Sequence, residues 1–117
     1  MNRAPSLTVT VGPVVSVGPG GASALDAPSD VRVLPMTDLE AARFVGGSRI
    51  GPRLEDGDRA ALEQVLLRVG ALVEEVPELT ELALNPLILR DGSAVVTQAL
   101  ASVRAVAHDP RPPVRRA

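Results

Sequence analysis

Hydrophobic and polar residues follow two periods along this chain, and each period predicts a different kind of element. Residues 7–11 alternate between apolar and polar, and residues 14–17 form a short, mostly β-branched run. Gly12-Pro13 lies between them, which is typical of two strands separated by a kink or turn. A third strand is predicted at residues 31–34, after a loop of small and polar residues.

Apolar residues spaced three and four apart predict two helices in the middle of the chain. Thr37-Asp38-Leu39-Glu40 is a capping box, so a short helix should begin there and end at Gly46-Gly47. Its expected buried side holds Leu39, Ala42 and Val45, with Phe44 at the edge.

A longer apolar stripe predicts a second helix that covers a sheet. The stripe consists of Leu62, Val65, Leu66, Val69, Leu72, Val73 and Val76. Asp56 or Asp58 can cap the start of this helix, and Pro77 ends it. A stripe of this kind is far more often part of a core than a surface for a partner.

The last third of the chain predicts a strand that ends at the polar Asn85, followed by a hairpin. The hairpin turns at Asp91-Gly92, a dipeptide favoured in type I′ turns because both central residues need a positive φ. Residues 99–106 fit either a strand or a small-residue helix, and their alanine content favours the helix. Residues 1–6 and the Pro/Arg-rich residues 108–117 should be disordered.

These elements predict one α+β domain over residues 7–107, with a mixed or antiparallel sheet of four to six strands. Two main helices should pack on one face of that sheet. A chain of 117 residues has the size of one domain but is short for a two-lobed enzyme.

Composition excludes several functions. There is no cysteine for a disulfide or a thiolate metal site, and all 12 basic residues are arginine, so no lysine is present for a P-loop or a Schiff base. The net charge of −2, with acids and bases mixed, gives no sign of a nucleic-acid surface. No apolar run is long enough for a secretion signal or a membrane span, so we expect a cytoplasmic protein.

A glycine-rich turn, Gly18-Pro19-Gly20-Gly21, directly follows the second predicted strand. Such a turn lets backbone N–H groups approach a phosphate. It lacks the spacing and the following helix of a dinucleotide fingerprint, so an ordinary turn is the alternative.

The order of these motifs resembles the C-terminal half of the ATP-grasp domain in NDP-forming acyl-CoA synthetases. That group includes ADP-forming acetate-CoA ligases, the succinyl-CoA synthetase β-subunit and forms fused to acetyltransferases. The matching features are Gly12-Pro13-Val14-Val15, Gly20-Gly21, residues 32–38, the long helix, and residues 78–87 with Asn85-Pro86-Leu87. The resemblance covers about residues 7–100 and implies a lobe that presents oxygen ligands to Mg²⁺ bound to ATP or ADP.

The resemblance implies a set of site residues, of which only part is present. Asn85 matches the family's metal-binding Asn, but Ala83 and Thr97 stand where the family has acidic residues. The family's Glu after the glycine turn is missing from residues 20–25, and Asp26 lies one residue beyond that stretch. By resemblance, Asn85 and Asp26 are the candidate metal ligands, and Gly18, Gly20 and Gly21 the candidate phosphate contacts. No catalytic residue is expected.

We therefore expect a partial ATP-grasp domain that is inactive alone, because Asn85 by itself offers Mg²⁺ little charge compensation. The family's nucleotide lobe, CoA-binding domains and phosphohistidine segment have no counterpart in the sequence. The chain should then act by self-association through an apolar sheet face, or with a protein that carries those parts. One alternative is a small subunit that completes an ATP-dependent acid-thiol ligase in trans. Another is a soluble α+β interaction domain with no role in nucleotide binding.

Overall fold

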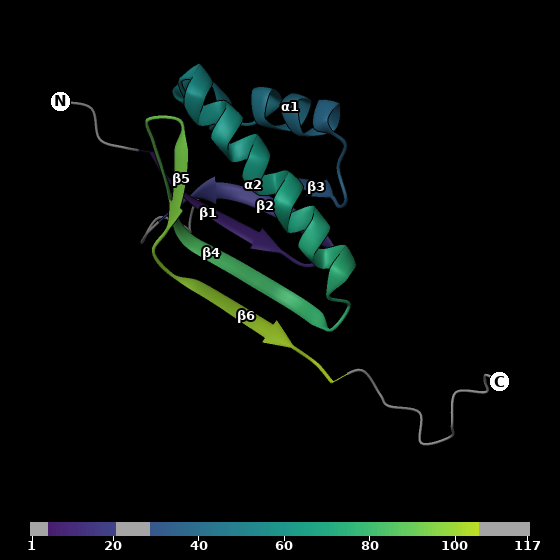
Figure 1. The fold of residues 1–117 in the computed structure, drawn as a ribbon. Coiled ribbons are helices and arrows are strands. Elements are labelled where there is room, and N and C mark those ends of the chain that lie inside the picture. The colour runs from purple at the N-terminus through teal and green to yellow at the C-terminus, as the bar shows by residue number, and fades with distance from the viewer. Residues whose placement is uncertain (1–4, 21–28, 106–117) are drawn as a thin grey trace, which may run out of the picture.

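In a computed structural model, residues 5–20 and 29–105 are described. They form six strands, two α-helices and one turn of 3₁₀-helix (Figure 1). In chain order these are β1 (Ser6–Val11), β2 (Val14–Pro19), β3 (Asp30–Val33), α1 (Asp38–Gly47), η2 (Gly51–Arg53), α2 (Asp56–Glu75), β4 (Leu79–Arg90), β5 (Ser93–Val96) and β6 (Ala99–Val103).

The strands form one sheet in the order β3-β2-β1-β4-β5, and every pairing is antiparallel. The long strand β4 organises this sheet, since β1 pairs along one side of it and β5 and β6 share the other side. β5 pairs with the end of β4 near Arg90, while β6 pairs with its beginning near Leu79. The expected α+β fold, with an antiparallel sheet and two helices, is confirmed.

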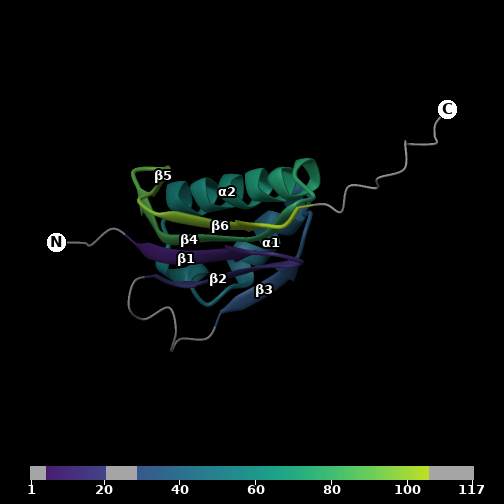
Figure 2. The same ribbon diagram turned by 90° about the horizontal axis from the view of Figure 1, so that it is seen from below.

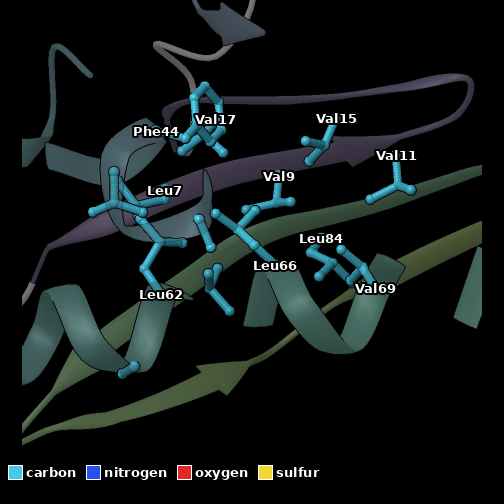
Figure 3. Packing of buried hydrophobic residues seen from close by; sticks show 14 of the residues in the cluster. Leu7, Val9, Val11, Val15, Val17, Phe44, Leu62, Leu66, Val69 and Leu84 are labelled. Atoms are coloured by element: carbon cyan, nitrogen blue, oxygen red, sulfur yellow. The ribbon is translucent and has the colours of Figure 1, made fainter. Parts of the chain in front are cut away.

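Both helices contribute to a single core on one face of the sheet. In β1, Leu7, Val9 and Val11 are fully buried, whereas the residues between them are only half-buried. This alternation follows from the period of two in a strand, which sends successive side chains to opposite faces. Figure 3 shows Leu66 and Val69 of α2 directed towards the buried side chains of the sheet.

The other side of the sheet, called the open face below, is covered by no helix of the described residues (Figure 2). Strand register places one row of side chains across it: Val31, Ser16, Thr10, Ala83 and Leu100. Small and hydroxyl-bearing residues occupy the middle of this row, and exposed apolar residues lie at its two ends.

The helix predicted for residues 99–106 is wrong, because residues 99–103 form the strand β6. β6 pairs with the first half of β4 over Leu79 to Leu84, which would otherwise have no neighbour on that side. Hydrogen bonding to β4 outweighs an alanine preference of a few tenths of a kcal/mol per residue.

The expected buried side of α1 is only partly right, because Val45 is buried as predicted but Leu39 and Ala42 are exposed. The buried residues are Ala41, Phe44 and Val45, while Leu39 is 59% exposed. The Phe44 ring lies 5.9 Å from the Arg32 guanidinium carbon of β3. The helix is therefore turned so that its largest ring meets the edge of the sheet, which sequence spacing alone could not reveal.

The strand predicted to end at Asn85 instead continues as β4 to Arg90, because neighbouring strands pair with it along this length.

The cap predicted for α2 is wrong, whereas the predicted tight turn is confirmed. Neither Asp56 nor Asp58 caps α2, whose N-cap residue is Glu55 without a side-chain hydrogen bond. The Asp58 carboxylate instead accepts a hydrogen bond from the Gly92 N–H at 3.4 Å, which ties α2 to the β4–β5 turn. That turn is confirmed, with φ of 54° at Asp91 and 75° at Gly92.

No helix among the described residues is both long and apolar enough to cross a membrane. Of the expected disordered ends, residues 1–4 and 108–117 lie outside the described residues, whereas Ser6 is the first residue of β1.

Candidate functional site

The sheet brings Gly18 and Asn85 to the same level, on either side of Thr8. Gly18 of β2 pairs with Thr8 of β1. On the other side of Thr8 the register shifts, so that Asn85 and Pro86 of β4 together face this single residue. Two strand spacings of about 4.8 Å separate the backbones of β2 and β4 at this level, or roughly 10 Å. Two of the predicted site residues, distant in sequence, therefore lie at one level of the sheet with β1 between them.

Asn85 lies where β5 gives way to β6 along the side of β4. Its backbone N–H donates to the Gln98 carbonyl at 3.2 Å, and the Thr97 N–H donates to the Pro86 carbonyl at 3.4 Å. The Asn85–Pro86 peptide bond is cis. Thr97 is exposed and lies beside Asn85, so the return strand brings this position to the place where a second ligand would be needed.

Thr8 lies between Gly18 and Asn85 and was not singled out from the sequence. Its hydroxyl oxygen is buried, and none of the described residues gives it a hydrogen-bond partner. Leaving a buried hydroxyl unpaired costs about 1–3 kcal/mol, so such a group needs an explanation. The signal in the sequence was the alternation of residues 7–11, which sends Thr8 and Thr10 to the open face.

The described part of the glycine turn is built around close contact between strands. The Gly20 N–H donates to the Ser6 carbonyl at 2.9 Å, and a Cβ at Gly20 would lie 2.9 Å from the backbone N and C of Leu7. Ser29 lies against Gly18 in the same way, with its Oγ 2.6 Å from a Cβ built there. The Gly20 N–H is therefore used within the sheet. Gly21 and Asp26 lie outside the described residues.

A pocket of about 200 Å³ lies beside this turn. Its lining consists of Val17, Gly18, Pro19, Asp30, Arg49, Ile50 and Arg53. A guanidinium nitrogen of Arg49 lies 3.7 Å from the Asp30 carboxylate, and the Arg49 side chain is 63% exposed. Arg49 thus has a local counter-charge in Asp30.

Acidic side chains are missing where a metal would need them. The described residues contain no group of three or more His, Cys, Asp or Glu that could hold a metal ion. On β4 the carboxylate on the same face as Ala83 is Glu81, four residues before Asn85. At about 3.3 Å per residue this is roughly 13 Å along the strand, too far for both to bind one ion. Within the described residues, the oxygen donors around Asn85 are neutral.

Comparison with known protein families shows which family this chain belongs to. A family model described as an ATP-grasp domain matches residues 8–103. The chain belongs to this ATP-grasp family. The resemblance found in the sequence is thereby confirmed, and the Asn85 level of the sheet lies inside the matched region.

Solved structures have the same fold as this ATP-grasp chain. One is the dinucleotide-forming acetyl-coenzyme A synthetase 1 of Candidatus Korarchaeum cryptofilum, in complex with coenzyme A and Mg-AMPPCP. It has a TM-score of 0.76 and 22% identity, over 89% of this chain and 55% of that one. The Pyrococcus horikoshii protein PH1788 has a TM-score of 0.75 and 19% identity, over 89% of this chain and 50% of that one. A search of curated proteins finds no match.

The ATP-grasp chain therefore spans about half the length of these structures. At this level of identity the similarity shows the fold alone.

Proposed function

We propose that this chain forms one wall of an ATP-grasp site related to that of ADP-forming acyl-CoA synthetases. By itself the chain binds no Mg²⁺-nucleotide. It acts together with protein residues that lie outside these 117. The observation that carries the proposal is the arrangement around Asn85. The amide lies in the middle of the sheet beside Thr8 and Thr97, while Ala83 occupies the preceding position on the same face.

The donor set does not fit Mg²⁺ unaided. Mg²⁺ gives up its water reluctantly and is usually held by one or two carboxylates together with substrate phosphates. Asn85, Thr8 and Thr97 offer only neutral oxygens, and no carboxylate among the described residues lies close to them on β4. In this proposal the chain supplies the sheet surface and the Asn85 amide, and the negative charge comes from elsewhere.

The test restores acidic side chains at positions 83 and 97 and measures whether the chain then binds Mg²⁺ with ADP. We expect the thermal midpoint of the unmodified chain to be the same in Mg²⁺ with ADP and in ADP with EDTA. The double variant A83D/T97D should gain a Mg²⁺-dependent rise, since a ligand at about 100 times its Kd adds roughly 2.7 kcal/mol. Adding N85A to this variant should remove the gain.

A matched control is S16D/V31D, which places two acids on the same row of the open face but two and three strands away from Ala83. It should show no Mg²⁺-dependent rise. A Mg²⁺-dependent shift in the unmodified chain would contradict the proposal, because the chain would then hold the metal-nucleotide unaided. If A83D/T97D gains no more than the control, the site does not lie at Asn85.

A further inference from the structure

The two edges of the sheet differ in charge. The β3 edge is short and carries Asp30 and Arg32, and Asp30 lies 3.7 Å from Arg49. The opposite edge, formed by β5 and β6, has no Asp, Glu, Lys or Arg from Ser93 to Val103. Charged residues and short strands are the usual means by which proteins prevent an edge from pairing with another chain. The β3 edge has both features, and the β5–β6 edge has no charge to protect it.

Along β6, the backbone N–H and C=O groups of successive residues alternate between facing β4 and pointing away from it. The Gln98 carbonyl accepts from Asn85, the Ser102 carbonyl accepts from the Thr80 hydroxyl, and the Arg104 N–H donates to Glu78. The backbone N–H and C=O groups of the even-numbered residues therefore face β4. Because residues of an antiparallel strand alternate in this respect, the N–H and C=O groups of Ala99 and Ala101 point outwards. No described segment pairs with them.

The side chains along this edge are apolar and exposed. Leu100 is 63% exposed, Val103 68% and Val95 53%, although each lies on a hydrogen-bonded strand. Leu100 lies on the open face, because it pairs with Ala83. The edge therefore combines free backbone groups with apolar side chains that another strand could cover.

We propose that β6 pairs with β6 of a second copy of this chain, antiparallel, to form one continuous sheet across the dimer. Because the β5–β6 edge carries no charged side chain, it does not attract a charged partner, and two copies of it do not repel each other. Antiparallel pairing of identical strands is self-complementary around a twofold axis. With Ala99 opposite Ala101 of the second copy, the outward N–H and C=O groups bond to each other, and the two Leu100 side chains face each other on the open face.

This pairing places both open faces on the same side of the joint sheet, and the helices of both copies on the other side. The twofold axis is perpendicular to the sheet, because paired residues share a face. The two Asn85 levels then form parts of one extended surface. This inference concerns the edge alone and does not depend on whether either copy holds a nucleotide.

The first experiment uses the absence of cysteine in the chain. In the proposed register the Leu100 Cα atoms lie about 4.5 Å apart, as in a non-hydrogen-bonded pair. A disulfide accepts Cα separations of about 4.4–6.8 Å. Mild oxidation of L100C should therefore give a disulfide-linked dimer at micromolar concentration. The control is V33C, whose native side chain is 66% exposed on the β3 edge, and it should stay mainly uncrosslinked.

The second experiment removes the pairing without changing β4. A101P deletes an N–H that points outwards, a position where a proline is tolerated in an edge strand. Light scattering should give twice the 12.1 kDa chain mass for the unmodified chain and the mass of one chain for A101P. The two proteins should have the same circular dichroism spectrum. A99K adds a charge while keeping its N–H, and should have the same effect if A101P fails to fold.

Two results would overturn the proposal. One is an unmodified chain that stays monomeric up to about millimolar concentration. The other is equal crosslinking of L100C and V33C, which would indicate random collision. Neither result bears on the metal test above, which is read from Mg²⁺-dependent stability at a fixed chain concentration.

Discussion

At the scale of single residues, the atoms next to each glycine decide whether a larger residue could replace it. Gly20 lies against the backbone of β1, where a Cβ would meet Ser6 Oγ at 2.6 Å and Leu7 backbone atoms at 2.9 Å. Gly46, near the end of α1, has no atom within 4 Å of its Cβ position. The turn glycine that we linked to phosphate binding thus has a packing reason to be glycine, independent of any ligand.

We expect G20A to lower the free energy of unfolding by about 1–3 kcal/mol, because the methyl group meets backbone atoms that cannot rotate away. G46A should raise it by about 0.4–1 kcal/mol, since alanine restricts the unfolded chain and fits the helix. Urea unfolding followed by circular dichroism measures both. A G20A variant as stable as the unmodified chain would show that β1 and the turn separate easily.

At the scale of elements, the capping box of α1 is the local feature that the sequence predicted most directly. The Thr37 N–H donates to Glu40 Oε1 at 3.0 Å, and the Glu40 N–H donates to Thr37 Oγ1 at 3.1 Å. These bonds stabilise the charged carboxylate. The Thr37 backbone bond, then the Thr37 side chain and the nearby Arg32 and Arg43, lower the pKa of Glu40 below its ordinary value.

This pKa shift predicts an acid-side loss of stability. A carboxyl group with a lower pKa in the folded state stabilises the fold above its unfolded pKa, and the contribution disappears as the pH falls through the folded pKa. The unmodified chain should therefore lose more stability than E40Q over that acidic range. E74Q on the exposed side of α2 is the control and should follow the unmodified chain. Parallel pH profiles for the unmodified chain and E40Q would contradict the capping role.

At the scale of the whole molecule, stability comes from one layer of helices packed on one sheet. Leu66 of α2 is fully buried and faces the middle of the sheet (Figure 3), whereas Leu72, later in the same apolar stripe, is 37% exposed. The stripe predicted from spacing therefore covers the sheet along its middle, while near its end Leu72 is partly exposed and Val73 still packs against the core.

We expect L66A to destabilise the chain by about 2–5 kcal/mol, through lost burial and the cavity that remains. L72A should destabilise it much less, because its side chain is already partly in water. The measurement is the urea midpoint of each variant, at one chain concentration so that any dimer contributes equally. Similar losses for the two variants would mean that α2 does not pack on the sheet as described.

The candidate site was predictable only in part. Asn85 could be found because its strand has a recognisable order of residues, and the tight turn at Asp91-Gly92 because both residues favour a positive φ. Thr8 could not be singled out, since a threonine in an alternating strand looks like many others. Its buried hydroxyl and its position opposite Asn85 depend on which strands pair and on the register shift in β4.

The sequence by itself determined the strands β1 to β3, the start of β4, the two α-helices and their order, because local spacing, caps and turn residues act over a few neighbouring positions. Tertiary structure decided the rest. It made residues 99–103 a strand, because β4 offered hydrogen bonds that a helix would have left unmade. It also rotated α1 to bury Phe44, and it placed Gly18 and Asn85 on one level of the sheet. These outcomes depend on pairing and packing between distant segments, which no local pattern records.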